Sequence, residues 1–137
     1  MKSPLARLLM LVALAIPALA VASARTTAKP EPKLAHMVFF TLKDQSPESI
    51  AKFVASCDKY LAGHLGTVSY SVGTIAKDVV EPVSDRDFNV ALHLVFDDKS
   101  AAEKYQKSDR HVKFVEENKS FFAKVRVFDS YLAPEVK

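Results

Sequence analysis

The segment from His36 to Lys43 has apolar residues at successive positions, and it constrains the fold more than any other stretch. Side chains alternate between the two faces of a β-strand. One face of this strand would carry Val38, Phe40 and Leu42, and the other would carry Met37 and Phe39. A strand that is apolar on both faces must be covered on both faces. We therefore predict helices on one side of this strand and a partner subunit on the other.

The first 24 residues have the pattern of an export signal. A short basic start precedes an apolar run from Leu8 to Ala20, and Ala22-Ser-Ala24 supplies the small residues that signal peptidase recognises. The alternative is a membrane anchor, but the apolar stretch contains Pro17 and is shorter than the roughly 20 residues that a span needs. We expect cleavage after Ala24, a secreted or periplasmic location, and no stable membrane span after cleavage.

The charge pattern excludes one class of partner. Without residues 1–24 the count of Lys+Arg falls from 19 to 17, against 16 acidic residues. The remaining charges are mixed in sign, with no basic run, so we expect neither a nucleic-acid surface nor an anionic-membrane surface. About 100 residues then remain, which is enough for one domain.

The only cysteine, Cys57, excludes an intrachain disulfide. It lies on an apolar helical stripe, so a buried thiol is the simpler interpretation. A reactive or intermolecular cysteine is the alternative.

The order of elements follows from periodicity and from start and stop signals. Residues 25–34 contain two prolines and predict a flexible linker. Ser46-Pro47 is a helix start, and Gly63 is a plausible cap after its end. The predicted strands are 35–43, 66–73, 88–96 and 125–132. The predicted helices are 46–61, one that is capped by Asp97 or Asp98 and breaks near Ser108-Asp109, and one from about 110 that carries Val112, Val115 and Phe122.

This order predicts an α+β fold on the ferredoxin-like plan over residues 35–133. Helices would cover one face of a four-stranded, mainly antiparallel sheet. The open face would still carry Met37 and Phe39, and we expect a homodimer to cover it sheet to sheet.

Several fragments, in this order and spacing, resemble the stress-responsive α/β-barrel (Dabb) domain family. They are His36-Met-Val-Phe-Phe, Asp87-Phe-Asn-Val-Ala-Leu, Tyr105 with His111-Val-Lys-Phe114, and Val125-Arg-Val-Phe-Asp-Ser-Tyr131. The resemblance covers about residues 35–132 and implies a dimeric ferredoxin-like α/β barrel.

One branch of that family is similar to olivetolic acid cyclase, and this similarity implies His36, Tyr105 and His111 as candidate catalytic residues. A neutral imidazole can remove a proton next to a carbonyl, while a phenol and a second imidazole stabilise the enolate oxygen. Such chemistry requires no metal or organic cofactor, and we expect none. The family's His-Pro-x-His run is replaced here by Ser108-Asp-Arg-His111, so the turn that aims His111 differs.

Each candidate also has a structural interpretation. His36 can be a strand-end residue bonded to backbone, Tyr105 a core aromatic, and His111 a helix-start residue in water. Among the residues outside the candidate set, we expect His93 at the dimer interface and His64 exposed. Asp129 is expected to be structural.

We therefore predict an exported, dimeric domain whose cleft binds a small apolar or aromatic molecule. The alternative is a cofactor-independent cyclase-like lyase or isomerase that uses the His and Tyr residues for acid–base chemistry. The enzyme requires His36, Tyr105 and His111 to converge on one pocket. A purely structural role requires a cleft that is filled by the protein's own side chains.

Overall fold

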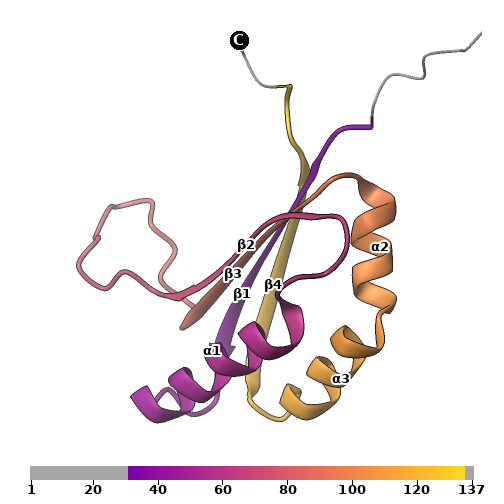
Figure 1. Ribbon diagram of the computed structural model, residues 1–137. Coiled ribbons are helices and arrows are strands. Elements are labelled where there is room, and N and C mark those ends of the chain that lie inside the picture. Colours follow the sequence, from indigo (N-terminus) through magenta and orange to yellow (C-terminus); the bar gives the residue numbers. More distant parts are fainter. Residues whose placement is uncertain (1–30, 135–137) are drawn as a thin grey trace, which may run out of the picture.

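The computed structural model describes residues 31–134 of the chain (Figure 1). The predicted signal peptide and residues 25–30 of the predicted linker lie outside the described residues. The elements in order are β1 (Leu34–Leu42), α1 (Pro47–Leu61), β2 (Thr67–Thr74), β3 (Val90–Phe96), α2 (Lys99–Lys107), α3 (Asp109–Asn118) and β4 (Phe122–Tyr131). Between residues 31 and 134, no helix has the length and apolar character needed to cross a membrane.

The four strands form one antiparallel sheet in the order β2-β3-β1-β4. β1 therefore pairs with a neighbour on each side, and its two ends lie beside the ends of the last strand, where Leu34 pairs with Tyr131. The strand order and the element order together make the ferredoxin-like plan, so the predicted fold class is confirmed.

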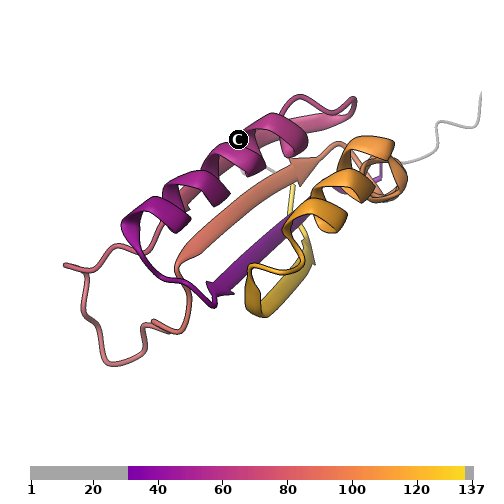
Figure 2. The same ribbon diagram turned by 90° about the horizontal axis from the view of Figure 1, so that it is seen from below.

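All three helices lie on one side of the sheet (Figures 1 and 2). The predicted face of β1, with Val38, Phe40 and Leu42, is buried beneath them. The core is aromatic where β1 meets α1, since the Phe40 and Phe53 ring centroids lie 4.9 Å apart. Deleting the Phe53 side chain would remove contacts to three other core aromatic rings, those of Phe40, Phe114 and Phe122.

Short polar side chains start the helices. The Ser46 hydroxyl accepts a hydrogen bond from the Ser49 amide at the start of α1, with Pro47 next in the chain. Asp98 caps α2 through the Ala101 amide at 2.7 Å. Ser108 ends α2 and also caps α3, because its hydroxyl accepts from the His111 amide at 3.2 Å. The α2–α3 break therefore occurs at Ser108, as predicted.

Two boundaries differ from the prediction. β3 begins at Val90 rather than at residue 88, and β4 begins at Phe122, which we had predicted as part of the third helix. α3 ends at Asn118, whose buried amide donates to Ser56 and to the Phe114 carbonyl, each at 2.8 Å. Phe122 is thereby released to pair with Leu42. Local periodicity could not predict that β4 begins at Phe122, because its pairing partner Leu42 is far away in sequence.

The face of α3 is also rotated from the predicted one. Val112 and Val115 are 45% and 40% exposed, whereas Phe114 and Asn118 are buried. A polar residue at a buried position is invisible to a search for apolar periodicity. Asn118 fits there because the two acceptors described above satisfy its amide group.

Cys57 lies on the core-facing side of α1, and its thiol is fully buried. Burial raises its pKa to about 12. It therefore stays protonated near neutral pH and is a structural residue, in agreement with the simpler interpretation.

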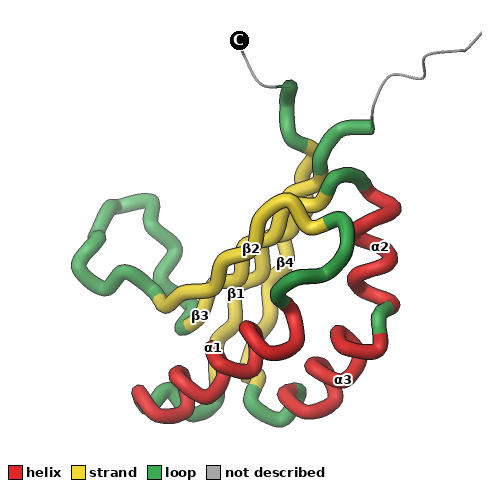
Figure 3. The backbone as a smooth tube through the Cα atoms, in the orientation of Figure 1, coloured by secondary structure: helices red, strands yellow, loops and turns green. Residues whose placement is uncertain are grey.

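A long loop, residues 75–89, projects from the sheet between β2 and β3 (Figure 3). Its base is tied to β4 by two ion pairs, Arg126 with Asp85 and Lys124 with Asp87. These side chains lie on the sheet face that the helices leave open, because Arg126 pairs in register with Phe39. The loop therefore borders the open face.

The two glycines of the α1–β2 loop differ in a way that tests this part of the fold. Both have positive φ, +69° at Gly63 and +83° at Gly66, but only Gly66 is crowded: a Cβ there would lie 2.6 Å from the Ala101 Cβ. We predict that Gly66→Ala lowers the free energy of unfolding by about 2–4 kcal/mol and that Gly63→Ala lowers it by about 1 kcal/mol. Urea unfolding of both variants measures this. Equal losses would contradict the described packing of Gly66 on α2.

Candidate functional site

A cavity of about 530 Å³ lies between the sheet and the α2–α3 pair. Most of its wall is apolar, and its polar side chains are those of His36, Tyr105, Gln106 and His111. Among residues 31–134, no lysine, arginine, aspartate or glutamate lines it. The cleft is therefore not filled by the protein's own side chains, which was the condition for a purely structural role.

Tyr105 is the central residue of the polar end. Its ring centroid lies 4.8 Å from that of His111 and 6.1 Å from that of His36. The side chain is only 2% exposed, and none of the described residues hydrogen-bonds to its hydroxyl. Burial raises the pKa of Tyr105, so the hydroxyl keeps its proton and remains a donor. An unpartnered donor on a residue of a cavity wall is a place for a ligand acceptor.

His36 is oriented by a carboxylate. It pairs in register with Asp129 across β1 and β4, and its Nδ1 lies 2.6 Å from the Asp129 Oδ1. Because a carboxylate oxygen accepts, Nδ1 carries a proton, and Nε2 is the ring nitrogen that does not bind Asp129.

We predicted only a structural role for Asp129 and did not predict its contact with His36. The two residues point to the same sheet face only because β4 pairs with β1 in this register. The sequence shows that Asp129 is in the last strand. It predicts a contact with His36 only when the pairing of the last strand with β1 is already known.

His111 lies in the first turn of α3 and is half-buried. Desolvation lowers its pKa; the backbone of Gln106 opposes this change, and the nearby imidazoles of His36 and His64 lower the pKa further. The neighbouring Arg110 turns away and donates to the Lys59 and Ala62 carbonyls at the end of α1. The Ser108 cap thus fixes the start of α3 and the position of His111, although the proline of the family's His-Pro-x-His run is absent.

The prediction that His64 is exposed was wrong. It is half-buried, its Nε2 lies 2.9 Å from the Tyr60 carbonyl, and its ring centroid lies 4.9 Å from that of Tyr105. His64 does not line the cavity but packs against a residue that does. The conformation of the α1–β2 loop sets the position of His64. In the sequence, the two glycines of this loop indicate a turn but do not predict where the His64 ring lies.

His93 lies on the opposite, open face of the sheet, and its predicted place at a dimer interface stays a prediction. Its ring is 6.2 Å from that of Phe39, and its Nδ1 lies 3.3 Å from the Ser71 hydroxyl. It is therefore separated by the sheet from the three candidate residues.

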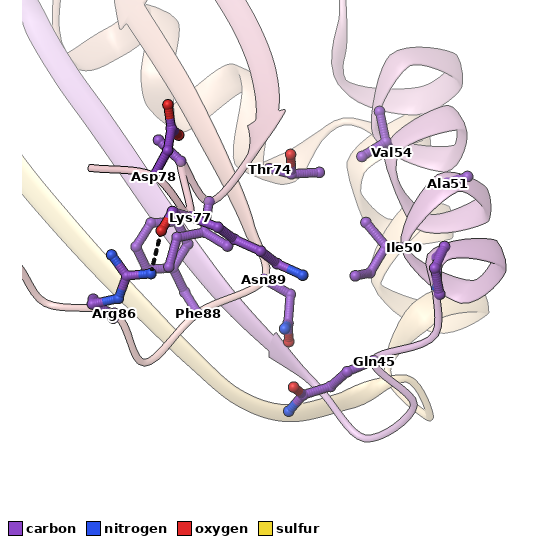
Figure 4. A pocket seen from close by; sticks show the side chains of 13 residues that line it. Gln45, Ile50, Ala51, Val54, Thr74, Lys77, Asp78, Arg86, Phe88 and Asn89 are labelled. Atoms are coloured by element: carbon purple, nitrogen blue, oxygen red, sulfur yellow. Dashed lines mark hydrogen bonds between the residues drawn. The ribbon is translucent and has the colours of Figure 1, made fainter. Parts of the chain in front are cut away.

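A second and larger cavity, of about 920 Å³, lies between α1 and the loop that follows β2. Figure 4 shows Ile50 and Val54 of α1 on one side of it and Phe88, Lys77 and Arg86 on the other. The Arg86 guanidinium is already bound to the Lys77 and Val79 carbonyls. This cavity has no histidine or tyrosine in its lining, so we place the candidate site in the smaller one.

The smaller cavity therefore combines an apolar body with a donor and two imidazoles at one end. The structure brings the predicted residues His36, Tyr105 and His111 together there. Their catalytic role stays a prediction. Within residues 31–134, no group of three or more His, Cys, Asp or Glu side chains is arranged to hold a metal ion.

Residues 34–132 match the sequence model of the stress responsive A/B barrel domain (Dabb) family. The chain belongs to this family. No curated protein sequence matches the chain significantly.

Solved structures of the same fold agree with this assignment. A Dabb family protein from Mesorhizobium loti with a ferredoxin-like fold has 22% identity and a TM-score of 0.64, over 76% of this chain and 100% of its own. A dimeric ferredoxin-like protein of unknown function from Thermobifida fusca has 14% identity and a TM-score of 0.63, over 77% and 96%. A hydroxynitrile lyase from Passiflora edulis has 21% identity and a TM-score of 0.62, over 80% and 100%. At these identities the similarity establishes the fold.

The lowered pKa of His111 predicts a pH effect on stability. The unfolded chain binds a proton at this residue near the ordinary pKa of about 6.5, whereas the folded protein binds it only at lower pH. Stability is therefore lost as the pH falls through about 6.5, until the lowered folded-state pKa is passed. We expect the wild type to lose more free energy of unfolding than His111→Gln between pH 7.5 and 5. Urea unfolding at several pH values measures the difference, and parallel pH profiles would contradict it.

Proposed function

We propose that this protein is an exported, homodimeric binding module for a small apolar or aromatic molecule with one oxygen-bearing end. The pattern of residues 1–24 supports export, and the cavity beneath α2 and α3 supports binding. The observation that carries the proposal is a mostly apolar cavity with Tyr105 in its wall, since the hydroxyl of Tyr105 has no hydrogen-bond partner among the described residues.

The lining defines the chemistry of the ligand. The cavity wall offers apolar contact but no ionised partner for a charged group, and burying an unpaired charge is costly. At the polar end, the Tyr105 hydroxyl donates, and a neutral His111 with its lowered pKa can accept. A neutral ketone, aldehyde or phenol matches this arrangement.

The open sheet face supports the homodimer. Phe39 lies at its centre, with ring centroids 5.0 Å from Phe88 and 5.8 Å from Phe128. Phe128 is 55% exposed. The nearby ion pairs of Arg126 and Lys124 are satisfied within the protomer, so a flat aromatic surface remains for a second copy. Solved structures of the same fold from other organisms are described as dimeric, which agrees with this proposal.

A second candidate function, acid–base catalysis by a cofactor-independent lyase or isomerase, is favoured by the His36–Asp129 pair. The carboxylate holds Nδ1–H and directs the basic Nε2 of the neutral ring away from itself, as the aspartate of a catalytic triad does. His36 would remove the proton, and Tyr105 would donate to the oxygen on which negative charge develops. The hydroxynitrile lyase of the same fold agrees with, but does not establish, such chemistry.

We predict that Tyr105→Phe weakens binding of 4-propylphenol and acetophenone by roughly five- to tenfold, because it removes one hydrogen bond and leaves the ring in place. Isothermal titration measures the affinities. The matched control, His93→Ala on the open face, should bind as the wild type does. Undetectable binding of either probe by the wild type, or equal affinities in wild type and Tyr105→Phe, would contradict the proposal.

The same acetophenone samples separate binding from catalysis. In D₂O, an acid–base enzyme would exchange the methyl protons of acetophenone, and Asp129→Asn would slow this at least about tenfold. The NMR methyl signal measures the exchange. Binding without exchange above that in buffer favours the binding module.

We predict that Phe128→Lys converts a dimer to a monomer at micromolar concentration, because two lysines would be buried at a sheet-to-sheet interface without partners. The control is Leu65→Lys, which places the same charge on an exposed residue of the α1–β2 loop. Sedimentation of the chain without residues 1–24 distinguishes the states. A monomeric wild type, or a dimeric Phe128→Lys variant, would contradict this interface.

A further inference from the structure

The loop between β2 and β3, residues 75–89, holds apolar side chains in solvent. Val80 and Val83 at its tip are 72% and 94% exposed, and Val79 beside them is also exposed. Single exposed apolar residues are common, but three within five positions form a patch, and such patches mark interaction sites. The valine tip, residues 79–83, is therefore a surface to which a partner can bind.

Hydrogen bonds hold this loop in one shape. The Arg86 guanidinium donates to the Val79 and Lys77 carbonyls and so joins the two limbs of the loop. Within the tip, the Ser84 amide donates to the Glu81 carbonyl at 3.0 Å. A partner that binds a loop already held in shape does not lose the free energy needed to order it. The valines are thus presented for binding.

The base of the loop packs on one end of the open sheet face. The Phe88 ring centroid lies 5.0 Å from that of Phe39. The Asp87 carbonyl accepts from the Thr41 hydroxyl and from the Arg126 guanidinium, each at 2.8 Å. Phe39 and Thr41 face away from the helices, and so does Arg126, which pairs with Phe39. Figure 1 accordingly shows the loop on the side of the sheet opposite α2 and α3.

The other end of the open face has no such cover among the described residues. The exposed side chains of Phe128, in β4, and Leu132, just after it, lie toward this end. Both face away from the helices, because the Leu132 amide donates to the Lys33 carbonyl at 2.9 Å and so continues the alternation of β4. The open face therefore has a covered end near Thr41 and a bare end near Leu132.

We propose that, in the homodimer, the valine tip of each protomer packs against the bare end of the second copy's open face. This inference rests on the proposed sheet-to-sheet dimer. It adds the orientation of the two sheets and a second contact between the copies.

The shape of the open face favours this orientation over the alternative. Sheets that pack face to face lie about 10 Å apart, so a loop that stands on one face reaches the other sheet. Two covered ends placed together would hold the sheets apart and leave Phe39 and Phe128 uncovered. A two-fold axis across the strands instead places each covered end on the bare end of the other copy, which makes the two surfaces self-complementary.

Cross-linking of the full chain tests the orientation. Val83→Cys with Leu132→Cys places one thiol on the tip and one at the bare end, while the native Cys57 is fully buried. At a concentration where the wild type sediments as a dimer, a short bis-maleimide should join this double variant into covalent dimers. The wild type and each single variant should stay unjoined. So should the control Val83→Cys with Leu65→Cys, because Leu65 is as exposed as Val83 but lies in the α1–β2 loop.

Covalent dimers from Val83→Cys alone would show that the two tips meet each other, and they would overturn the proposal. The absence of covalent dimers from the Val83→Cys, Leu132→Cys variant would overturn it as well.

Sedimentation equilibrium measures the strength of the tip contact. Val83→Ser removes an apolar side chain that makes little contact within its own protomer, so the monomer should fold as the wild type does. We expect the dissociation constant of the dimer to rise about tenfold, because each dimer buries Val83 twice. The matched control Val112→Ser, at an exposed position of α3, should leave the constant unchanged.

The outcomes separate this inference from the proposed dimer. A wild type that is monomeric would overturn both. A wild-type dimer that Phe128→Lys dissociates and that Val83→Ser leaves unchanged would overturn the tip contact alone.

Discussion

The packing of β1 between two neighbouring strands and under the helices is the constraint on which the rest of the structure depends. β1 hydrogen-bonds to β3 on one side and to β4 on the other, and its helix-facing side chains are the centre of the core. Phe40 is in contact with aromatic rings from α1, α3 and β4. Because interiors are close-packed, a change in this strand would shift every element that carries a pocket residue.

The pocket lies between the sheet and the α2–α3 pair. On β1, Phe40 packs against Phe53 of α1, and His36 contacts the edge of the Tyr105 ring at the polar end of the cavity. The Ser108 break permits this arrangement, since it ends the helix of Tyr105 and starts the helix of His111 within a few residues. A single continuous helix would not bring both rings to one place.

Groups outside the cavity wall orient the polar side chains at this end of the site. Asp129 orients His36 from the edge strand β4 on the same sheet face, where its carboxylate is half exposed to solvent. The helix end of α1 holds His64 behind Tyr105. The cavity wall is mostly apolar, and no Lys, Arg, Asp or Glu among the described residues lines it, so the cavity suits an uncharged ligand better than an ionised one.

Much of the fold followed from local signals, because caps, prolines and apolar alternation act over a few residues. Ser46-Pro47, the faces of β1 and the break at Ser108 were predicted in this way, and the family resemblance pointed to His36, Tyr105 and His111. By itself, the sequence determined the class of fold and which residue types were available to a site. Only the tertiary structure decided that Asp129 meets His36, that Phe122 leaves the helix to pair with Leu42, and that His64 packs against Tyr105. Each of these depends on strand register or on contacts between residues distant in sequence, which no local pattern encodes.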